Sequence, residues 1–369
     1  MDGLIFTLVA LLLFVVILGG LVLVHELGHY LSAKALDVRV LEFGIGFPPR
    51  AKVLRARGET LWTLNWLPIG GFVRMEGEDG DASGDPRSFS AKPLWVRLTV
   101  LVSGVLVNIV LAFVIFFVIA LAASPVIGVR IGEVDPSSPA AAAGLQANDK
   151  LFGVAGERFE FFGDRSLTQA LRDRVGQTID LQVVRADGTP ATVTATLRPP
   201  EQLSETVGAL GIRGPNGTGL EVVYSGEYVG HDVGRAFGIA TAELGRWGGL
   251  ILSGLGALVD GFVRNPTAPP PASGPVGIAV TLADIFIGAG PILTLYVAAI
   301  LSVNLGVVNI LPFPPLDGGR MAVLVIKRLF GSRVSLRAER LTYAIGFVVL
   351  MAFMLWVTGF DLVRLGSTP

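Results

Sequence analysis

The chain has 369 residues, of which 51% are hydrophobic and 16% are charged, and its formal net charge is −1. A soluble domain typically carries about 25% charged residues, so the composition excludes an ordinary soluble protein and indicates that much of the chain lies in lipid. The near-neutral charge gives no sign of a nucleic-acid partner. The absence of cysteine excludes disulfides and thiolate metal ligands, although it does not identify a compartment.

The first apolar run, residues 4–23, is long enough to cross a bilayer, since about 20 apolar residues suffice. It follows an acidic N-terminus and is too long for a signal-peptide core, so we expect segment 1–36 to contain a retained transmembrane helix. Basic residues follow the run. By the positive-inside rule, this places the N-terminus outside the cytoplasm and the end of the helix at the cytoplasmic face.

A His-Glu-x-x-His pattern, formed by His25, Glu26 and His29, stands at that end. On a helix the two histidines share one face and can hold one metal ion, and Glu26 is placed to take a proton from water. Ionisable side chains in lipid are costly and indicate function by default. The alternative is a pair of core histidines. We favour metal binding because two of the three histidines of the chain fall in the pattern beside a glutamate.

Residues 37–96 are expected to form a loop on the cytoplasmic side, with strands at 38–47, 61–67 and 71–75. Pro48 and Pro49 should end the first strand. Two tryptophans suit an interface, so we expect a small sheet that touches the membrane.

The second span is expected at 97–124. Asn108, near its middle, either packs against another helix or lines the active site, and the sequence leaves both readings open.

Residues 127–200 are expected to form a separate α+β domain, with strands at 129–134, 149–154, 178–185 and 191–197 and short helices at 138–144 and 166–174. This order resembles a PDZ domain, a module that binds peptides by strand addition. A small domain without a ligand is the alternative.

A polar connector, 201–290, is expected next on the outer side. Within it, residues 237–263 are apolar but interrupted by charges, which is typical of an interfacial amphipathic helix. We expect His231 to be an exposed loop residue.

The third span and the helix after it occupy segment 291–340, and the last span lies in 341–369 with the C-terminus outside. A catalytic zinc keeps three protein ligands, so the third would be a carboxylate or His231. Asp317 is the best candidate, because it follows a span at the depth of the paired histidines. An N-cap for a helix that begins near Arg320 is the alternative. A fifth span at 237–263 would carry Asp317 to the opposite face, so four spans are expected.

With these residues in view, the chain resembles the site-2 protease family of intramembrane zinc metalloproteases, in its bacterial regulator of sigma-E protease (RseP-like) branch. The likeness covers nearly the whole chain. The chain departs from the family pattern in two ways. It has room for one PDZ domain where the best-known relatives have two, and Ile109 follows Gly104-x-x-x-Asn108 where many relatives have phenylalanine. The likeness rests on the histidine motif, Asn309-x-x-Pro312-x-Pro314-x-x-Asp317-Gly, Ser273-Gly-Pro-Val-Gly-Ile-Ala and Phe43-Gly-Ile-Gly-Phe47.

The resemblance implies a polytopic α-helical membrane protein with four transmembrane helices, a membrane-associated re-entrant β element and an inserted extracytoplasmic PDZ (α+β) domain. It implies a bacterial inner-membrane protein whose active site lies near the cytoplasmic face. Zn²⁺ would be held by His25, His29 and Asp317, with Glu26 as general base. The residues expected to bind substrate or shape the site are Asn309, Asn108, Gly44, Gly46, Pro312 and Pro314.

The expected partners are the lipid bilayer and single-pass transmembrane substrates of the anti-sigma-factor or remnant-signal-peptide type. These would be cut after another protease removes their outer domain, and a peptide or substrate ectodomain would bind the PDZ domain. Two other classes remain for comparison, a membrane scaffold with a vestigial metal site and a metal transporter or sensor. Glu26 argues against the scaffold, since a structural zinc needs no general base, and the gathering of polar residues at one depth argues against a carrier.

Overall fold

The computed structural model describes residues 3–78, 84–163, 165–204, 207–215, 219–265, 267–331 and 335–367. The chain divides into two compact units. The first comprises residues 1–116 and 240–369 and the second comprises residues 117–239.

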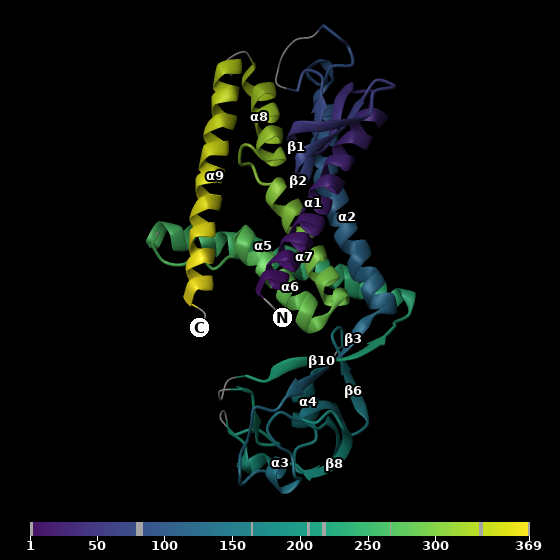
Figure 1. Cartoon of the computed structure of the whole chain (residues 1–369), viewed down its shortest axis with the longest axis vertical. Coiled ribbons are helices and arrows are strands. Elements are labelled where there is room, and N and C mark those ends of the chain that lie inside the picture. Colours follow the sequence, from purple (N-terminus) through teal and green to yellow (C-terminus); the bar gives the residue numbers. More distant parts are fainter. Residues whose placement is uncertain are drawn as a thin grey trace. The chain divides into compact units, whose positions relative to one another are not determined.

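Four helices in the first unit are long and apolar enough to cross a membrane, as the sequence predicts. The N-terminal end of α1 and the C-terminal end of α9 lie at one end of this helix group, and the sheet and α8 lie at the other end (Figure 1). A chain that crosses a membrane an even number of times has both termini on the same side, and this placement agrees with that. The four helices are α1 (Gly3–Ala35), α2 (Leu94–Ala122), α7 (Pro291–Asn309) and α9 (Leu336–Ser367).

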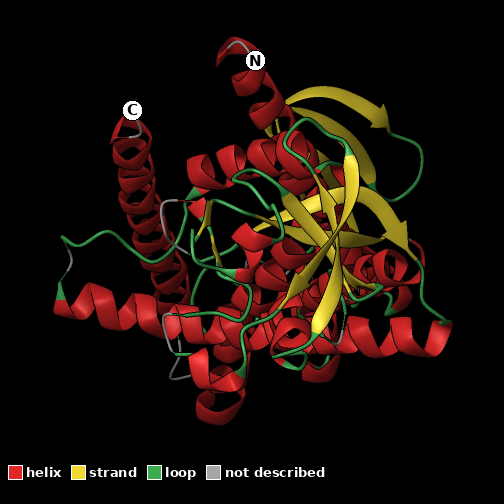
Figure 2. Ribbon diagram, turned by 90° about the horizontal axis from the view of Figure 1, so that it is seen from below, coloured by secondary structure: helices red, strands yellow, loops and turns green. Residues whose placement is uncertain are grey.

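Helix α5 (Val233–Arg264) is not among these four candidate spans. Its part in the first unit runs across the direction of α9 (Figures 1 and 2). Glu243 fixes it to α7, because its carboxylate accepts hydrogen bonds from Trp247 Nε1 at 3.1 Å and from the hydroxyl of Tyr296. The helix predicted over 237–263 is therefore present, and it is four residues longer at its N-terminal end.

Helix α6 (Pro275–Ala289) lies in the part of the predicted connector that follows the helix expected over 237–263, where no further helix was expected. The buried carboxylate of Asp361, on α9, accepts hydrogen bonds from the backbone N–H groups of Gly274 and Gly277 at 3.1 and 2.8 Å. A Cβ at either glycine would lie within 2.9 Å of that carboxylate. The Ser-Gly-Pro-Val-Gly sequence thus provides a helix N-terminus that satisfies a charge buried in a span.

Strands β1 (Val40–Arg55) and β2 (Leu61–Met75) form the sheet predicted after the first span. The prolines at 48 and 49 do not end β1, contrary to expectation. The chain bends there and pairs again, with a register shift between Phe47↔Leu67 and Arg50↔Asn65. Residues 40–47 consequently pair with 61–67 on one side and with 71–75 on the other, so that 71–75 is an outer edge of the sheet.

The second unit contains a six-stranded antiparallel sheet of order β10-β3-β6-β5-β7-β8 around an apolar core. Strand β10 lies in the stretch predicted to be a polar connector, and it pairs with β3 from Ser124↔Val229 to Arg130↔Glu221. A two-stranded pair, β4 (Glu133–Val134) with β9 (Ile212–Arg213), and two short helices, α3 (Pro139–Ala142) and α4 (Leu167–Arg172), complete the unit. The strands of the six-stranded sheet are β3 (Ser124–Arg130), β5 (Lys150–Val154), β6 (Glu157–Glu160), β7 (Thr178–Val184), β8 (Pro190–Thr196) and β10 (Glu221–Val229).

Candidate metal centre

Three side chains far apart in the sequence meet in the first unit. His25 and His29 stand one turn apart on α1, each only 5% exposed, with their rings at 89° to each other. Their Nε2 atoms are 3.2 Å apart, and Asp317 Oδ2 lies 2.9 Å from the first and 3.2 Å from the second. Among the described residues, these three form the one group of His, Asp and Glu side chains whose ligand atoms converge in this way.

The separations of the three atoms fit a tetrahedral zinc site. Ligand atoms about 2.0–2.1 Å from a tetrahedral ion are about 3.3 Å from one another, close to the distances seen here. Two imidazole lone pairs that face each other beside a carboxylate are stabilised by a cation placed between them. The three residues line a cavity, which leaves room for water beside them, as a catalytic rather than a structural zinc requires.

The other ring nitrogen of each histidine is held by α2. His29 Nδ1–H donates to the carbonyl oxygen of Val100 at 2.8 Å, which leaves the Nε2 lone pair facing the site. The amide nitrogen of Asn108 lies 3.3 Å from His25 Nδ1, and the amide oxygen has no hydrogen-bond partner among the residues described. Metal binding through His25 Nε2 would leave the proton on Nδ1, and turning the amide by 180° would present its oxygen to that proton as an acceptor. Asn108 therefore supports His25 from α2.

Glycines let α2 approach the histidines this closely. A Cβ on Gly104 would lie 2.5 Å from His29 Nε2 and 2.8 Å from His25 Cε1. A Cβ on Gly28 would lie 2.7 Å from the carbonyl oxygen of Ser103. Both contacts are shorter than real Cβ contacts, so any larger residue would separate the two helices or fill the site. From the sequence, Gly104 belonged only to a family motif and was not expected at the site.

Asp317 is the first residue of α8 (Asp317–Phe330), and Leu316 precedes it as the N-cap without a side-chain cap. The N-cap interpretation of Asp317 is therefore wrong, because the helix begins three residues earlier than expected and the carboxylate contacts the histidines. Gly318 and Gly319 are buried. A Cβ on either would lie within 2.5 Å of the backbone of residues 310–314, so the turn before α8 packs tightly.

Glu26 faces the same cavity from α1 and is held by the sheet. Its Oε2 accepts a hydrogen bond from the backbone N–H of Val73 at 3.1 Å, on the outer edge of β2. A carboxylate beside a group of metal-ligand atoms, with its second oxygen free of any described hydrogen bond, is placed to accept a proton from water.

The cavity has a volume of about 330 Å³, and Glu26, both histidines, Asp317 and Asn309 line it. Of the other residues predicted to bind substrate or shape the site, none is in the lining, although Asn108 contacts His25. The four without such a contact are Gly44, Gly46, Pro312 and Pro314. Gly44 acts indirectly, since a Cβ there would lie 2.3 Å from the ring of Phe72, which does line the cavity.

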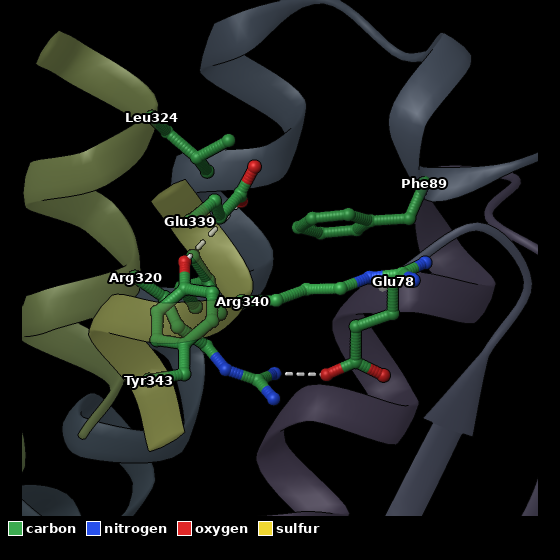
Figure 3. A pocket seen from close by; sticks show the side chains of 8 residues that line it. Glu78, Phe89, Arg320, Leu324, Glu339, Arg340 and Tyr343 are labelled. Carbon is green, nitrogen blue, oxygen red and sulfur yellow. Dashed lines mark hydrogen bonds and ion pairs between the residues drawn. The ribbon is translucent and has the colours of Figure 1, made fainter. Parts of the chain in front are cut away.

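A second cavity of about 320 Å³ adjoins the first, and Glu78, Leu101 and Arg320 line both. Arg320 reaches from α8 to Glu78, and the two form an ion pair at the boundary (Figure 3). Glu78 also accepts a hydrogen bond from the N–H of Met75. Burial opposes the charge of Arg320, but Glu78 and Asp317 outweigh burial and raise the pKa of the guanidinium. This pair was not predicted, because nothing in the sequence signals a contact between positions 78 and 320.

His231 is not part of the group, in agreement with the sequence analysis, but it is not an exposed loop residue. Its side chain is only 4% exposed, and its Nε2 lies 3.1 Å from Glu160 Oε2 in the second unit. The expectation of exposure was wrong because β10, which immediately precedes His231, folds onto the sheet and brings the histidine to β6.

Substitution of Gly104 by alanine is expected to abolish tight metal binding, because the added methyl group would overlap the ring of His29. Gly20→Ala on α1 is the matched control, since a Cβ there meets no atom within 4 Å. Metal content of the purified proteins, measured by mass spectrometry, distinguishes the two. A full metal complement in Gly104→Ala would contradict the packing argument.

The chain matches known proteins along most of its length. The sequence model of peptidase family M50 matches residues 13–353. Zinc metalloprotease RasP of Geobacillus kaustophilus is 31% identical, with 96% of this chain and 98% of the relative covered. A putative zinc metalloprotease of Brucella suis is 30% identical (95% and 94% covered), and the regulator of sigma-W protease RasP of Bacillus subtilis is 27% identical (95% and 98%). The chain therefore belongs to peptidase family M50, the site-2 protease family of intramembrane zinc metalloproteases, and is itself a zinc metalloendopeptidase.

Proposed function

We propose that this protease cleaves the transmembrane segments of single-pass membrane proteins, with His25, His29 and Asp317 as zinc ligands and Glu26 as the general base. The observation that carries the proposal is the meeting of Glu26 with the three ligand residues in one cavity, at the end of the helix group that holds α8. Basic residues on the loops at that end favour the cytoplasmic face, with both termini outside, in a bacterial inner membrane.

Each residue of the site has its own role in hydrolysis. Bound zinc supplies Lewis acidity, which polarises the scissile carbonyl and makes water a stronger acid. Glu26 takes the proton from the attacking water and later delivers it to the leaving amine. Val100 and Asn108 hold the imidazoles in the orientation that directs Nε2 into the cavity. Asn309, on the cavity wall, is placed to donate hydrogen bonds to the substrate backbone.

Substitution Glu26→Gln is expected to lower cleavage of a single-span reporter by at least about 100-fold, the lower end of what a general base contributes. The side chain keeps its size and its contact with Val73, so metal content should not change. Parallel assays of reporter cleavage and zinc content test this directly. A scaffold or a metal carrier would be unaffected by the substitution, and undiminished cleavage would rule out Glu26 as the base.

We propose further that an extended stretch of substrate adds to the outer edge of residues 71–75. A helical substrate hides its carbonyls in backbone hydrogen bonds and must unwind before attack, and an open sheet edge offers replacement bonds. Gly71, Phe72, Val73 and Met75 line the cavity, and the N–H groups of 73 and 75 already donate away from the rest of the sheet. A substrate carbonyl that accepts the hydrogen bond of the Val73 N–H would replace Glu26 as its partner. Glu26 would then be free to accept a proton when the scissile bond reaches the metal centre.

Proline at Val73 is expected to abolish cleavage, because it removes an outward N–H of this edge, the one that a substrate carbonyl would use, and bends the strand. Val73→Ala serves as the control that shortens the side chain but keeps the backbone donor. The rate of reporter cleavage is measured for both variants at equal metal content. Equal activity of the proline and alanine variants would refute strand addition here.

The relatives support a role in regulated intramembrane proteolysis, since that from Bacillus subtilis is named a regulator of sigma-W protease. We infer that the substrates are anti-sigma factors or remnant signal peptides, trimmed first by another protease. The resemblance of residues 127–200 to a PDZ domain supports a peptide or a substrate ectodomain as its ligand, on the extracytoplasmic side. The second unit would then admit or dock substrates, while the first unit cuts them.

Excision of residues 124–229, with a short Gly-Ser linker in their place, is expected to loosen substrate choice without removing hydrolysis. Ser124 pairs with Val229, so the ends to be joined are neighbours, and the excision leaves no unpaired strand of the six-stranded sheet. Two reporters are compared, one with a bulky ectodomain and one without. The variant should cleave both, whereas the full chain cleaves only the second. Loss of all cleavage at unchanged zinc content would contradict a gating role.

A further inference from the structure

A third cavity in the first unit lies away from the metal centre and has no role in the reaction described above. Its volume is about 560 Å³. It is bounded by the start of α2 and by a residue near the end of α8. The lining residues are Pro93, Leu94, Trp95, Arg97, Leu98 and Arg328.

The lining carries two positive charges and no carboxylate. Among the described residues, Arg97 Nε is buried without a hydrogen-bond partner, and Arg328 is exposed and forms no ion pair. The carboxylate whose charge reaches Arg97 is Glu339, which is already bonded to Lys327 Nζ at 2.7 Å. A buried guanidinium donor without a partner is costly, and an anion that bridges the two arginines would satisfy it.

The rest of the lining is apolar and lies at the end of a span. Trp95 is 61% exposed at the second residue of α2, a candidate transmembrane helix, with Leu98 one turn further on. Tryptophan at a span end is typical of the membrane–water interface. A ligand that matches the whole cavity therefore has an anionic group for the arginines and a hydrocarbon portion for Trp95 and Leu98.

We propose that this cavity binds an anionic phospholipid, with its phosphate between Arg97 and Arg328 and an acyl chain along Trp95 and Leu98. Basic pockets between transmembrane helices at a membrane face are suited to such headgroups. The lipid would join the end of α8, the helix that begins with Asp317, to the start of α2, the helix that carries Val100 and Asn108. Lipid binding should therefore stabilise the helices that surround the metal centre, by mass action on the folded state.

The test compares lipids added to the full chain, purified with its zinc in a neutral detergent. Thermal unfolding is followed by tryptophan fluorescence after addition of phosphatidylglycerol, of phosphatidylcholine, or of inorganic phosphate. We expect phosphatidylglycerol to raise the Tm by several degrees and the other two additions to have little effect. An equal rise with phosphatidylcholine would overturn the proposal, and so would an equal rise with inorganic phosphate, which would make the site one for a free anion.

Substitutions test whether the Tm rise with phosphatidylglycerol comes from binding in this cavity. Arg97→Gln combined with Arg328→Gln should lose more than half of the Tm rise, and Arg328→Gln alone, an exposed change that keeps the fold, should lose part of it. Arg55→Gln combined with Arg57→Gln removes the same charge from another exposed basic segment and should respond as the unaltered chain does. An unchanged rise in both cavity variants, or an equal loss in the control pair, would place the lipid elsewhere.

Discussion

The convergence of His25, His29 and Asp317 is the constraint on which the rest of the first unit depends. Two of these residues lie on α1 and the third is 292 positions from His25, yet their ligand atoms meet within 3.2 Å. When both Nε2 atoms present lone pairs, as metal binding requires, the three atoms repel one another and a cation between them relieves that repulsion. The helices that carry them must therefore be held by packing, and the glycines at the crossing of α1 with α2 and at the start of α8 allow that packing.

The sheet of β1 and β2 connects the parts of the site. One edge segment, residues 71–75, provides the amide that holds Glu26 and leads to Glu78, which pairs with Arg320 on the helix of the aspartate. The same edge borders the cavity and has backbone groups that no other strand in the described part of the chain pairs with. An unpaired edge is a liability in most proteins because it invites aggregation, but beside a protease centre it offers a place for an extended substrate.

Differences between the expected and the observed fold arise where long-range pairing overrides a local signal. Pro48 and Pro49 resemble a strand end, but β1 bends through them because 61–67 continues to pair beyond the bend. Residues 221–229 contain three valines and two tyrosines, which favour a strand, but they lie in a stretch expected to be a connector, and their pairing partner β3 is about 100 positions away. That pairing in turn buries His231 beside Glu160. Helix α6 was missed because its N-terminus is satisfied by Asp361, a partner more than 80 positions away.

The sequence alone determined the membrane class, the four spans and the motif on α1, because hydrophobic length and helical spacing are local properties. It also pointed to Asp317, but left two readings of that residue equal. Only the tertiary structure decided between them, since the start of α8 and the direction of a carboxylate depend on the packing of Gly318 and Gly319 against the preceding turn. The same holds for Gly104, Val100 and the Glu78–Arg320 pair. Their roles come from contacts across the helix group, and such contacts have no period or spacing that a single sequence can display.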